Sequence, residues 1–243
     1  CSNKLNYMNK NLFWLIALLF TLSFGFMSCA EDTTVEDPYA NWEDRNVRYL
    51  DSIADVARAN EIPELNEVGK WVIKCNYKIS NESSLNPGLG GSSVSSNPFE
   101  TPPSVNDSVY MKVLEVGEGS NRISPLYTDT VSVYYRGTLI DEKTVFDQNY
   151  SGDLNTEVHV PTHFALQAKQ SDGVFGDGLI VGWITALQYM KEGDRVELYI
   201  PSALGYGKQG QSSIPANSVL KFDLKLEKVI HPDGLESYSL KVD

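Results

Sequence analysis

Apolar and charged residues alternate most clearly near the C-terminal end of the chain. Four apolar residues point one way and four charged residues the other: Leu220, Phe222, Leu224 and Leu226 alternate with Lys221, Asp223, Lys225 and Glu227. A period of two is typical of a β-strand with one buried face. The pattern predicts a strand over 219–228. Less regular alternation predicts strands over 108–116, 130–140 and 195–200, and a weaker one over 157–166.

A helical spacing of apolar residues interrupts these strands. Ile180, Trp183, Leu187 and Met190 fall on one face of a short helix that should end before Gly193. The strands show no βαβ alternation. The sequence therefore predicts an α+β fold in which an antiparallel sheet covers a single helix, with Trp183 between helix and sheet.

Residues 41–80 carry a helix and a strand of their own. Asn41, with Asp44 three residues later, can cap a helix that ends near Asn60. Its apolar positions are Val47, Leu50, Ala54 and Ala57. Alternation over 71–79 predicts a half-buried strand whose apolar face holds Trp71, Ile73, Cys75, Tyr77 and Ile79. The sequence leaves open whether this part packs against the rest of the chain.

Two further features of this part bear on function. Cys75 lies on the apolar face with no activating histidine nearby, so we interpret it as a core residue and not a nucleophile. Gly, Ser, Pro and Asn supply 18 of the 26 residues in 81–106, which predicts a flexible linker or a long loop.

The one long apolar run, residues 12–27, lies near the start of the chain. Its 16 residues are fewer than the roughly 20 that a membrane-spanning helix needs. Together with Lys10 before it, the run is typical of a signal peptide. We therefore expect a signal peptide over 1–28, with residues 1–7 upstream of a start at Met8.

The residues after this run favour a lipid anchor. Ser28-Cys29 resembles the end of a bacterial lipobox, in which the cysteine is acylated and becomes the new N-terminus. Residues 29–40 are polar and acidic, as a tether would be, and resemble those of lipoproteins of the Bacteroidetes. This resemblance implies a lipoprotein of the bacterial envelope, anchored to a lipid bilayer through Cys29. The outer membrane is the expected location, at its periplasmic face or the cell surface. The alternative is an ordinary signal peptide that contains a cysteine.

Composition excludes several classes of protein. Lys and Arg total 20 against 32 Asp and Glu, which gives a net charge of -12. This acidity argues against nucleic acid as a partner, because phosphate binding needs a basic surface. Three cysteines are too few for a disulfide framework.

Motifs for covalent or cofactor chemistry are not recognisable. The glycines at 176, 178 and 182 lack dinucleotide-binding spacing, and Gly205-Tyr206-Gly207-Lys208 is not a phosphate-binding loop. His159 and His163 are four apart, but Pro161 between them argues against a helical metal pair. We therefore expect no metal and no cofactor.

Two longer patterns resemble the FK506-binding-protein (FKBP) family of peptidyl-prolyl cis-trans isomerases. The first runs from Val131 through Tyr135, Gly137 and Leu139 to Phe146-Asp147. The second comprises Leu179-Ile180, Gly182-Trp183, Met190, Gly193, Ile200-Pro201, Leu204 to Gly207, Ile214-Pro215 and Leu220 to Phe222. The resemblance covers roughly 107–230. It implies a bent antiparallel sheet around one short helix, preceded here by a small helix and strand.

The resemblance also implies a shallow apolar pocket with Trp183 as its floor. The residues expected to act on a bound chain are Tyr135, Phe146, Asp147, Ile180, Trp183, Tyr206 and Phe222. The other residues expected to bind substrate are Leu179, Ile214 and Thr162. Thr162 stands where an aromatic residue is common, which would open one wall. Gln211 and Ser213 make the nearby loop more polar, the loop 167–178 is several residues longer, and the turn 141–144 lacks the usual glycine.

These expectations lead to one principal function and two alternatives. The resemblance implies an isomerase that acts on proline-containing chains of envelope or exported proteins, and a pocket able to bind FK506-type macrolides. A non-catalytic module of the same fold, or a folding helper for extended segments, would use the same pocket. The tail 231–243 carries no recognisable signal.

Overall fold

The computed structural model describes residues 37–76, 104–166, 170–171, 174–175 and 179–232. Two compact units are distinguished, Cys1–Ala40 and Asn41–Asp243, and the second contains every element discussed below. The expected signal peptide, Cys29, most of the linker, most of the loop 167–178 and nearly all of the C-terminal tail lie outside the described residues. Within them, no helix is both long and apolar enough to span a membrane.

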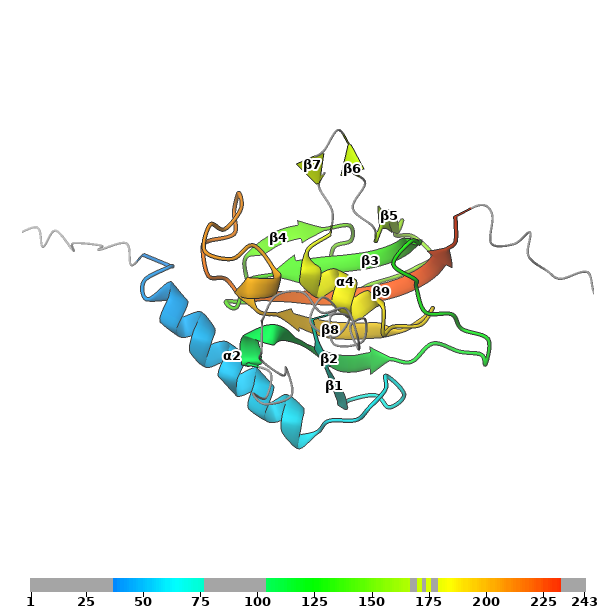
Figure 1. Ribbon diagram of the computed structural model, residues 1–243, viewed down its shortest axis with the longest axis horizontal. Coiled ribbons are helices and arrows are strands. Elements are labelled where there is room, and N and C mark those ends of the chain that lie inside the picture. Colours follow the sequence, from blue (N-terminus) through cyan, green and yellow to red (C-terminus); the bar gives the residue numbers. More distant parts are fainter. Residues whose placement is uncertain (1–36, 77–103, 167–169, 172–173, 176–178, 233–243) are drawn as a thin grey trace, which may run out of the picture. The chain divides into compact units, whose positions relative to one another are not determined.

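An antiparallel sheet, whose strands differ in length, forms the centre of this unit (Figure 1). Its strands are β1 (Trp71–Cys75), β2 (Ser108–Glu115), β3 (Thr130–Thr138), β4 (Val145–Gln148), β5 (Thr162–Ala165), β8 (Arg195–Ile200) and β9 (Leu220–Ile230). Their order is β1-β2-β8-β9-β3-β4, with β5 also paired to β3. Two short strands, β6 (Gln170–Ser171) and β7 (Val174–Phe175), pair separately. The helices are α2 (Trp42–Ala59) and α4 (Val181–Leu187), with short 3-10 turns η1 (Val105–Asp107) and η2 (Ser202–Leu204). The predicted α+β fold is confirmed.

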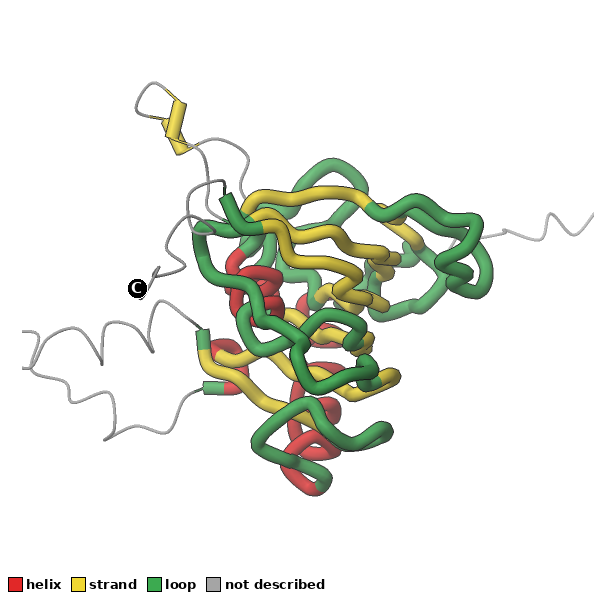
Figure 2. Tube along the Cα trace, turned by 90° about the vertical axis from the view of Figure 1, so that its right-hand side faces the viewer, coloured by secondary structure: helices red, strands yellow, loops and turns green. Residues whose placement is uncertain are grey.

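Strand β9 shows why the alternating pattern predicts its structure well. Leu220, Leu224 and Leu226 are fully buried, as expected. Its pairing with β3 then skips Glu227, so that Val229 and not Lys228 is the next buried residue. Such a bulge bends the strand and increases its twist. In Figure 2 the strands are seen as a curved stack, consistent with a bent sheet.

Helix α4 covers one face of the sheet and completes the main core. Trp183, Ala186 and Leu187 are buried in one cluster with the inward-facing residues of β2, β3, β8 and β9. Figure 1 shows α4 crossing in front of β8 and β9. The expected position of Trp183 between helix and sheet is confirmed.

Helix α2 packs on the other side of strands β1, β2 and β8. Leu50, Ala54 and Ala57 of α2 form a second buried cluster that includes Tyr110 and Tyr199. These tyrosines alternate with residues of the main core along their strands, so the sheet is buried on both faces here. The sequence leaves open whether the helix and strand of 41–80 pack against the rest of the chain. They do, because β1 pairs with β2 in the main sheet.

Several details of 41–76 differ from the expectation. Asn41 stands at the N-cap position, but it has a positive φ of 51° and its side chain makes no capping bond. Val47 is 54% exposed and so lies off the buried face of α2. Val72 is buried as well as Trp71, so β1 is not half-buried, because helix and core enclose it on opposite sides. Burial raises the pKa of the half-buried Cys75 thiol, in keeping with an unreactive residue.

Elements between the main strands differ most from the predictions. The strand expected over 157–166 begins only at Thr162, because Val158 and Val160 are exposed and the His159 N–H bonds to the Asn155 carbonyl in a turn. Strand β4 was not predicted. The turn η1 lies at the end of the expected linker, where Ser104 and Asp107 cap each other's backbone N–H groups.

Candidate functional site

Three aromatic rings surround the indole of Trp183 at the first turn of α4, where the family resemblance places a pocket. The indole of Trp183 lies 5.2 Å from the ring of Tyr135, 5.6 Å from that of Phe164 and 5.2 Å from that of Phe222, between ring centroids. The planes of all three rings stand at 80° or more to the indole. This edge-to-face arrangement is favourable for aromatic pairs. The three rings therefore stand upright against the indole of Trp183.

A glycine in β3 allows the walls to meet. Gly137 pairs with Phe222 across β3 and β9. A Cβ atom at this position would lie 2.6 Å from the ring of Phe146 and 2.7 Å from the ring of Phe222. Those two rings are 5.3 Å apart and nearly perpendicular. Because Gly137 has no side chain, a further ring, that of Phe146, can occupy the space beside it.

The rim of the site carries polar groups. The Tyr135 hydroxyl donates a hydrogen bond of 3.1 Å to the Asp147 carboxylate. Burial, and then the charge of Asp147, raises the pKa of Tyr135 to about 12, and the same two causes raise the pKa of Tyr206. Both hydroxyls therefore stay protonated at neutral pH and can donate hydrogen bonds.

Two of the donors near α4 have no acceptor within the described part of the chain. They are the hydroxyl of Tyr206 and the backbone N–H of Ile180, the N-cap residue of α4. Both residues are partly buried and pack against the main core, as does Leu179. Ile214, buried in the loop that follows Tyr206, belongs to the same core. All the expected pocket residues of the second pattern thus pack in one core cluster.

Thr162 is hydrogen-bonded to a neighbouring side chain. Its hydroxyl oxygen accepts a hydrogen bond of 3.1 Å from the Asn149 side chain, which also bonds to the backbone of Val133 and Tyr135. The ring that contacts Trp183 comes from Phe164, two residues later on the same face of β5. Phe164 thus supplies an aromatic contact to Trp183 from the strand that also carries Thr162. The sequence signal for it was available, because Phe164 is the one aromatic residue in β5.

Comparison with known proteins places this site in a family. A sequence model described as FKBP-type peptidyl-prolyl cis-trans isomerase matches residues 122–227. The Escherichia coli K12 protein FkpA, an FKBP-type peptidyl-prolyl cis-trans isomerase, is 40% identical over 115 residues, 47% of this chain and 35% of FkpA. The FKBP-type 22 kDa isomerase of the same strain is 35% identical over 128 residues, 52% of each chain. A crystal structure of a peptidyl-prolyl cis-trans isomerase from Pseudomonas syringae pv. tomato is 31% identical, with a TM-score of 0.39. The similarity covers 51% of this chain and 76% of that one.

The chain belongs to the FKBP-type peptidyl-prolyl cis-trans isomerase family. The matched region contains β3, β4, β5, α4 and β8, and most of β9 up to Glu227, and therefore every ring of the pocket. The chain spans between about a third and a half of the length of the two curated relatives. Helix α2 and strands β1 and β2 lie outside the part that the family model matches.

The site of this FKBP-family chain combines apolar side chains with a few polar groups. Among the described residues, no covalent catalyst is recognisable in it. Within the same part of the chain, no group of three or more His, Cys, Asp or Glu side chains could hold a metal ion. His159 accepts a hydrogen bond from the Asn155 backbone through Nδ1. The chemistry available in the pocket is apolar contact and hydrogen-bond donation.

The raised pKa of the pocket tyrosine predicts a loss of stability at alkaline pH. Tyr135 is neutral in both states below its ordinary pKa of 10, so its contribution is fully present there. Between pH 10 and about 12 the unfolded chain loses this proton and the folded chain keeps it, so the free energy of unfolding falls. Urea unfolding at pH 8, 10 and 11 should show this fall, and Tyr135→Phe should make it smaller.

The matched control is Tyr189→Phe, because Tyr189 is exposed. Burial raises the pKa of several other tyrosines, so part of the slope will remain in every variant. Equal slopes in the Tyr135 variant and the parent would contradict the assignment.

Proposed function

We propose that this chain catalyses cis-trans isomerisation of X–Pro peptide bonds. One observation carries the proposal: a buried indole floor, upright aromatic walls and two donors without acceptors in the described residues, Tyr206 and Ile180, occur together. A proline ring is apolar and flat enough to rest on an indole. The carbonyl groups beside it are acceptors for the two donors.

The reaction needs little beyond such a site. Rotation about an X–Pro bond is slow because partial double-bond character imposes a barrier of about 20 kcal/mol. In the twisted transition state this resonance is lost and the carbonyl becomes less polar. Transfer from water to an apolar pocket therefore costs the polar planar amide more free energy than it costs the twisted state. This difference lowers the barrier without a covalent step.

The polar residues then have positioning roles. The Tyr206 hydroxyl and the Ile180 N–H would each hold a carbonyl of the bound chain and fix its geometry. Asp147 accepts a hydrogen bond from the Tyr135 hydroxyl and so orients that ring. A general base is not required, because no proton is transferred in the rotation.

The competing function is a binding module that holds proline-containing segments without catalysis. The test is exchange NMR on a short X–Pro peptide with the parent chain and with Tyr206→Phe. Catalysis predicts faster cis-trans exchange with the parent and slower exchange with the variant. Peptide binding without faster exchange, by a folded parent, would favour the binding module and reject the isomerase.

We further propose that the clients are envelope or exported proteins, with the chain held at a bilayer through acylated Cys29. The support is the apolar run 12–27 followed by Ser28-Cys29 and an acidic stretch. Labelled palmitate should be incorporated into the parent and not into Cys29→Ser. Incorporation into both, or into neither, would reject this anchor.

The same pocket is proposed to bind FK506-type macrolides. The support is the apolar surface that Trp183 and the rings packed around it offer to a ligand of this kind. An FK506-type macrolide should compete with the X–Pro peptide in the exchange experiment. Peptide exchange that is unaffected by saturating macrolide would contradict this proposal.

A further inference from the structure

The loop that carries Tyr206 and Ile214 is attached to helix α2. We call residues 205–219 the flap. The flap begins after η2 and ends where β9 starts. Its base is closed by a hydrogen bond of 2.9 Å from the Asn217 N–H to the Gly207 carbonyl. Its tip is held by the paired backbone groups of Gln211 and Ile214.

Two buried side chains of α2 bind the C-terminal end of the flap. The Trp42 indole N–H donates to the Ser218 hydroxyl at 2.9 Å. The Asn46 side-chain oxygen accepts from the Val219 N–H at 2.7 Å. Trp42, Asn46 and Ser218 are only 7%, 2% and 3% exposed, so these bonds do not exchange freely with water. We call Trp42, Asn46 and Ser218 the clamp.

The clamp is connected to the pocket wall over a short path. The Ser218 hydroxyl donates in turn to the Pro215 carbonyl at 2.6 Å, and Pro215 follows the pocket residue Ile214. Asn217 lies beside Ser218 and binds Gly207, the residue after Tyr206. A shift at Ser218 would therefore move both ends of the flap.

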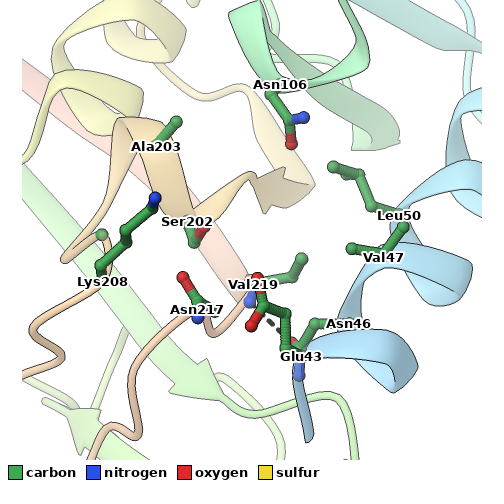
Figure 3. Close-up of a pocket in the computed structure, with 11 residues that line it drawn as sticks. Glu43, Asn46, Val47, Leu50, Asn106, Ser202, Ala203, Lys208, Asn217 and Val219 are labelled. Atoms are coloured by element: carbon green, nitrogen blue, oxygen red, sulfur yellow. Dashed lines mark hydrogen bonds between the residues drawn. The ribbon is translucent and has the colours of Figure 1, made fainter.

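An open groove lies next to the clamp, between α2 and the flap. It has a volume of about 370 Å³ and is lined from one side by Glu43, Val47 and Leu50 and from the other by Gly207, Lys208 and Asn217. Figure 3 shows Asn46 and Val219 joined by a hydrogen bond among these residues. Beside this groove, the bonds of the clamp join α2 to the C-terminal end of the flap, and core packing holds Ile214.

We propose that Trp42, Asn46 and Ser218 are positioning residues that set the geometry of Tyr206 and Ile214 for the bound chain. The inference rests on the proposed function, because it concerns substrate binding at the same site. Helix α2 lies outside residues 122–227, the part that the family model matches. Binding of proline-containing chains then depends on a helix that the matched domain does not include.

The test is a double-mutant cycle in the full chain. Trp42→Phe and Ser218→Ala each break the same hydrogen bond, and each should raise KM for an X–Pro peptide about fivefold or more, with kcat nearly unchanged. The double variant should match Ser218→Ala, because that single variant already loses the bond to Trp42 as well as the bond to Pro215. Ala54→Gly is the control, since it weakens α2 by its low helix propensity at a buried position eight residues after Asn46 and leaves both bonds of the clamp in place.

The KM and kcat values separate positioning from mere loss of folding. Partial unfolding reduces the active fraction, so it lowers apparent kcat and leaves KM at the parental value, as expected for Ala54→Gly. Parental KM in folded Trp42 and Ser218 variants, or a double variant equal to the product of the single effects, would overturn the proposal.

Peptide binding distinguishes this failure from failure of the proposed function. If the parent does not speed exchange, the isomerase is rejected, and the clamp is judged by the peptide Kd from NMR titration. A Kd raised in both single variants and not in Ala54→Gly supports the clamp. Equal Kd values in all of these chains reject it.

Discussion

Trp183→Ala is expected to lower kcat/KM for an X–Pro peptide by about 100-fold or more. The substitution removes the floor of the pocket and the ring against which Tyr135, Phe164 and Phe222 all pack. Loss of a positioned binding surface of this size is sufficient for such an effect. Because Trp183 is only 3% exposed, the free energy of unfolding should also fall, by about 3–5 kcal/mol. Exchange NMR and urea unfolding measure the two effects.

Trp183→Phe separates the catalytic effect from the loss of stability. The phenyl ring retains an apolar floor and removes the indole N–H, which is buried with no acceptor among the described residues. Losing this unpaired donor should offset part of the cost of the smaller ring. The variant should fold and keep more activity than Trp183→Ala. A folded Trp183→Ala chain with parental activity would show that catalysis occurs elsewhere.

Gly137→Ala is expected to damage the pocket from the opposite wall. The new methyl group would lie 2.6 Å from the Phe146 ring and 2.7 Å from the Phe222 ring, closer than real carbon contacts. At least one ring must move, at a cost of about 1–3 kcal/mol in the free energy of unfolding. Since both rings border the site, kcat/KM should fall by about tenfold.

A second substitution tests whether the ring contact is the cause. Phe146→Leu removes the ring that Gly137→Ala would press most closely. The double variant should therefore be less destabilised than the sum of the single variants predicts. A double variant destabilised by the full sum would mean that the alanine acts through another contact.

The core elements could be predicted from local patterns, because the apolar residues that set the period of each strand or helix are the ones buried in the core. In β9, every second residue from Leu220 to Leu226 is apolar and buried. Around α4, Trp183 and Leu187 lie one turn apart and face the same core. Both elements could be predicted because burial of one apolar face contributes most of their stability.

Residues fixed by long-range polar contacts could not be predicted in this way. Asn46 is of a residue type usual on the surface of a helix, yet it is buried because it accepts the Val219 N–H from a residue 173 positions away. Val47 is of a residue type usual in a core, yet it faces the groove beside the flap. The spacing of apolar residues within α2 carries no information on where the flap lies.

The site shows the same division. Tyr135, Trp183 and Phe222 were expected from the family resemblance, and the structure brings their rings together. Thr162 was expected from the same resemblance to bind substrate, and the contact between β5 and Trp183 that the structure shows is made by Phe164, two residues later. With the turn at 155–159 ending the irregular segment, the strand begins at Thr162, and Phe164 then falls on the inner face.

Contact between the proline ring and Trp183 during accelerated exchange is the most direct test of the central claim. An X–Pro peptide in fast exchange with the chain should show upfield-shifted proline ring protons and nuclear Overhauser contacts to the Trp183 indole protons, together with faster cis-trans exchange. Accelerated exchange with the proline protons unshifted and in contact with other residues would contradict the assigned pocket. Contact with Trp183 and no acceleration would contradict catalysis.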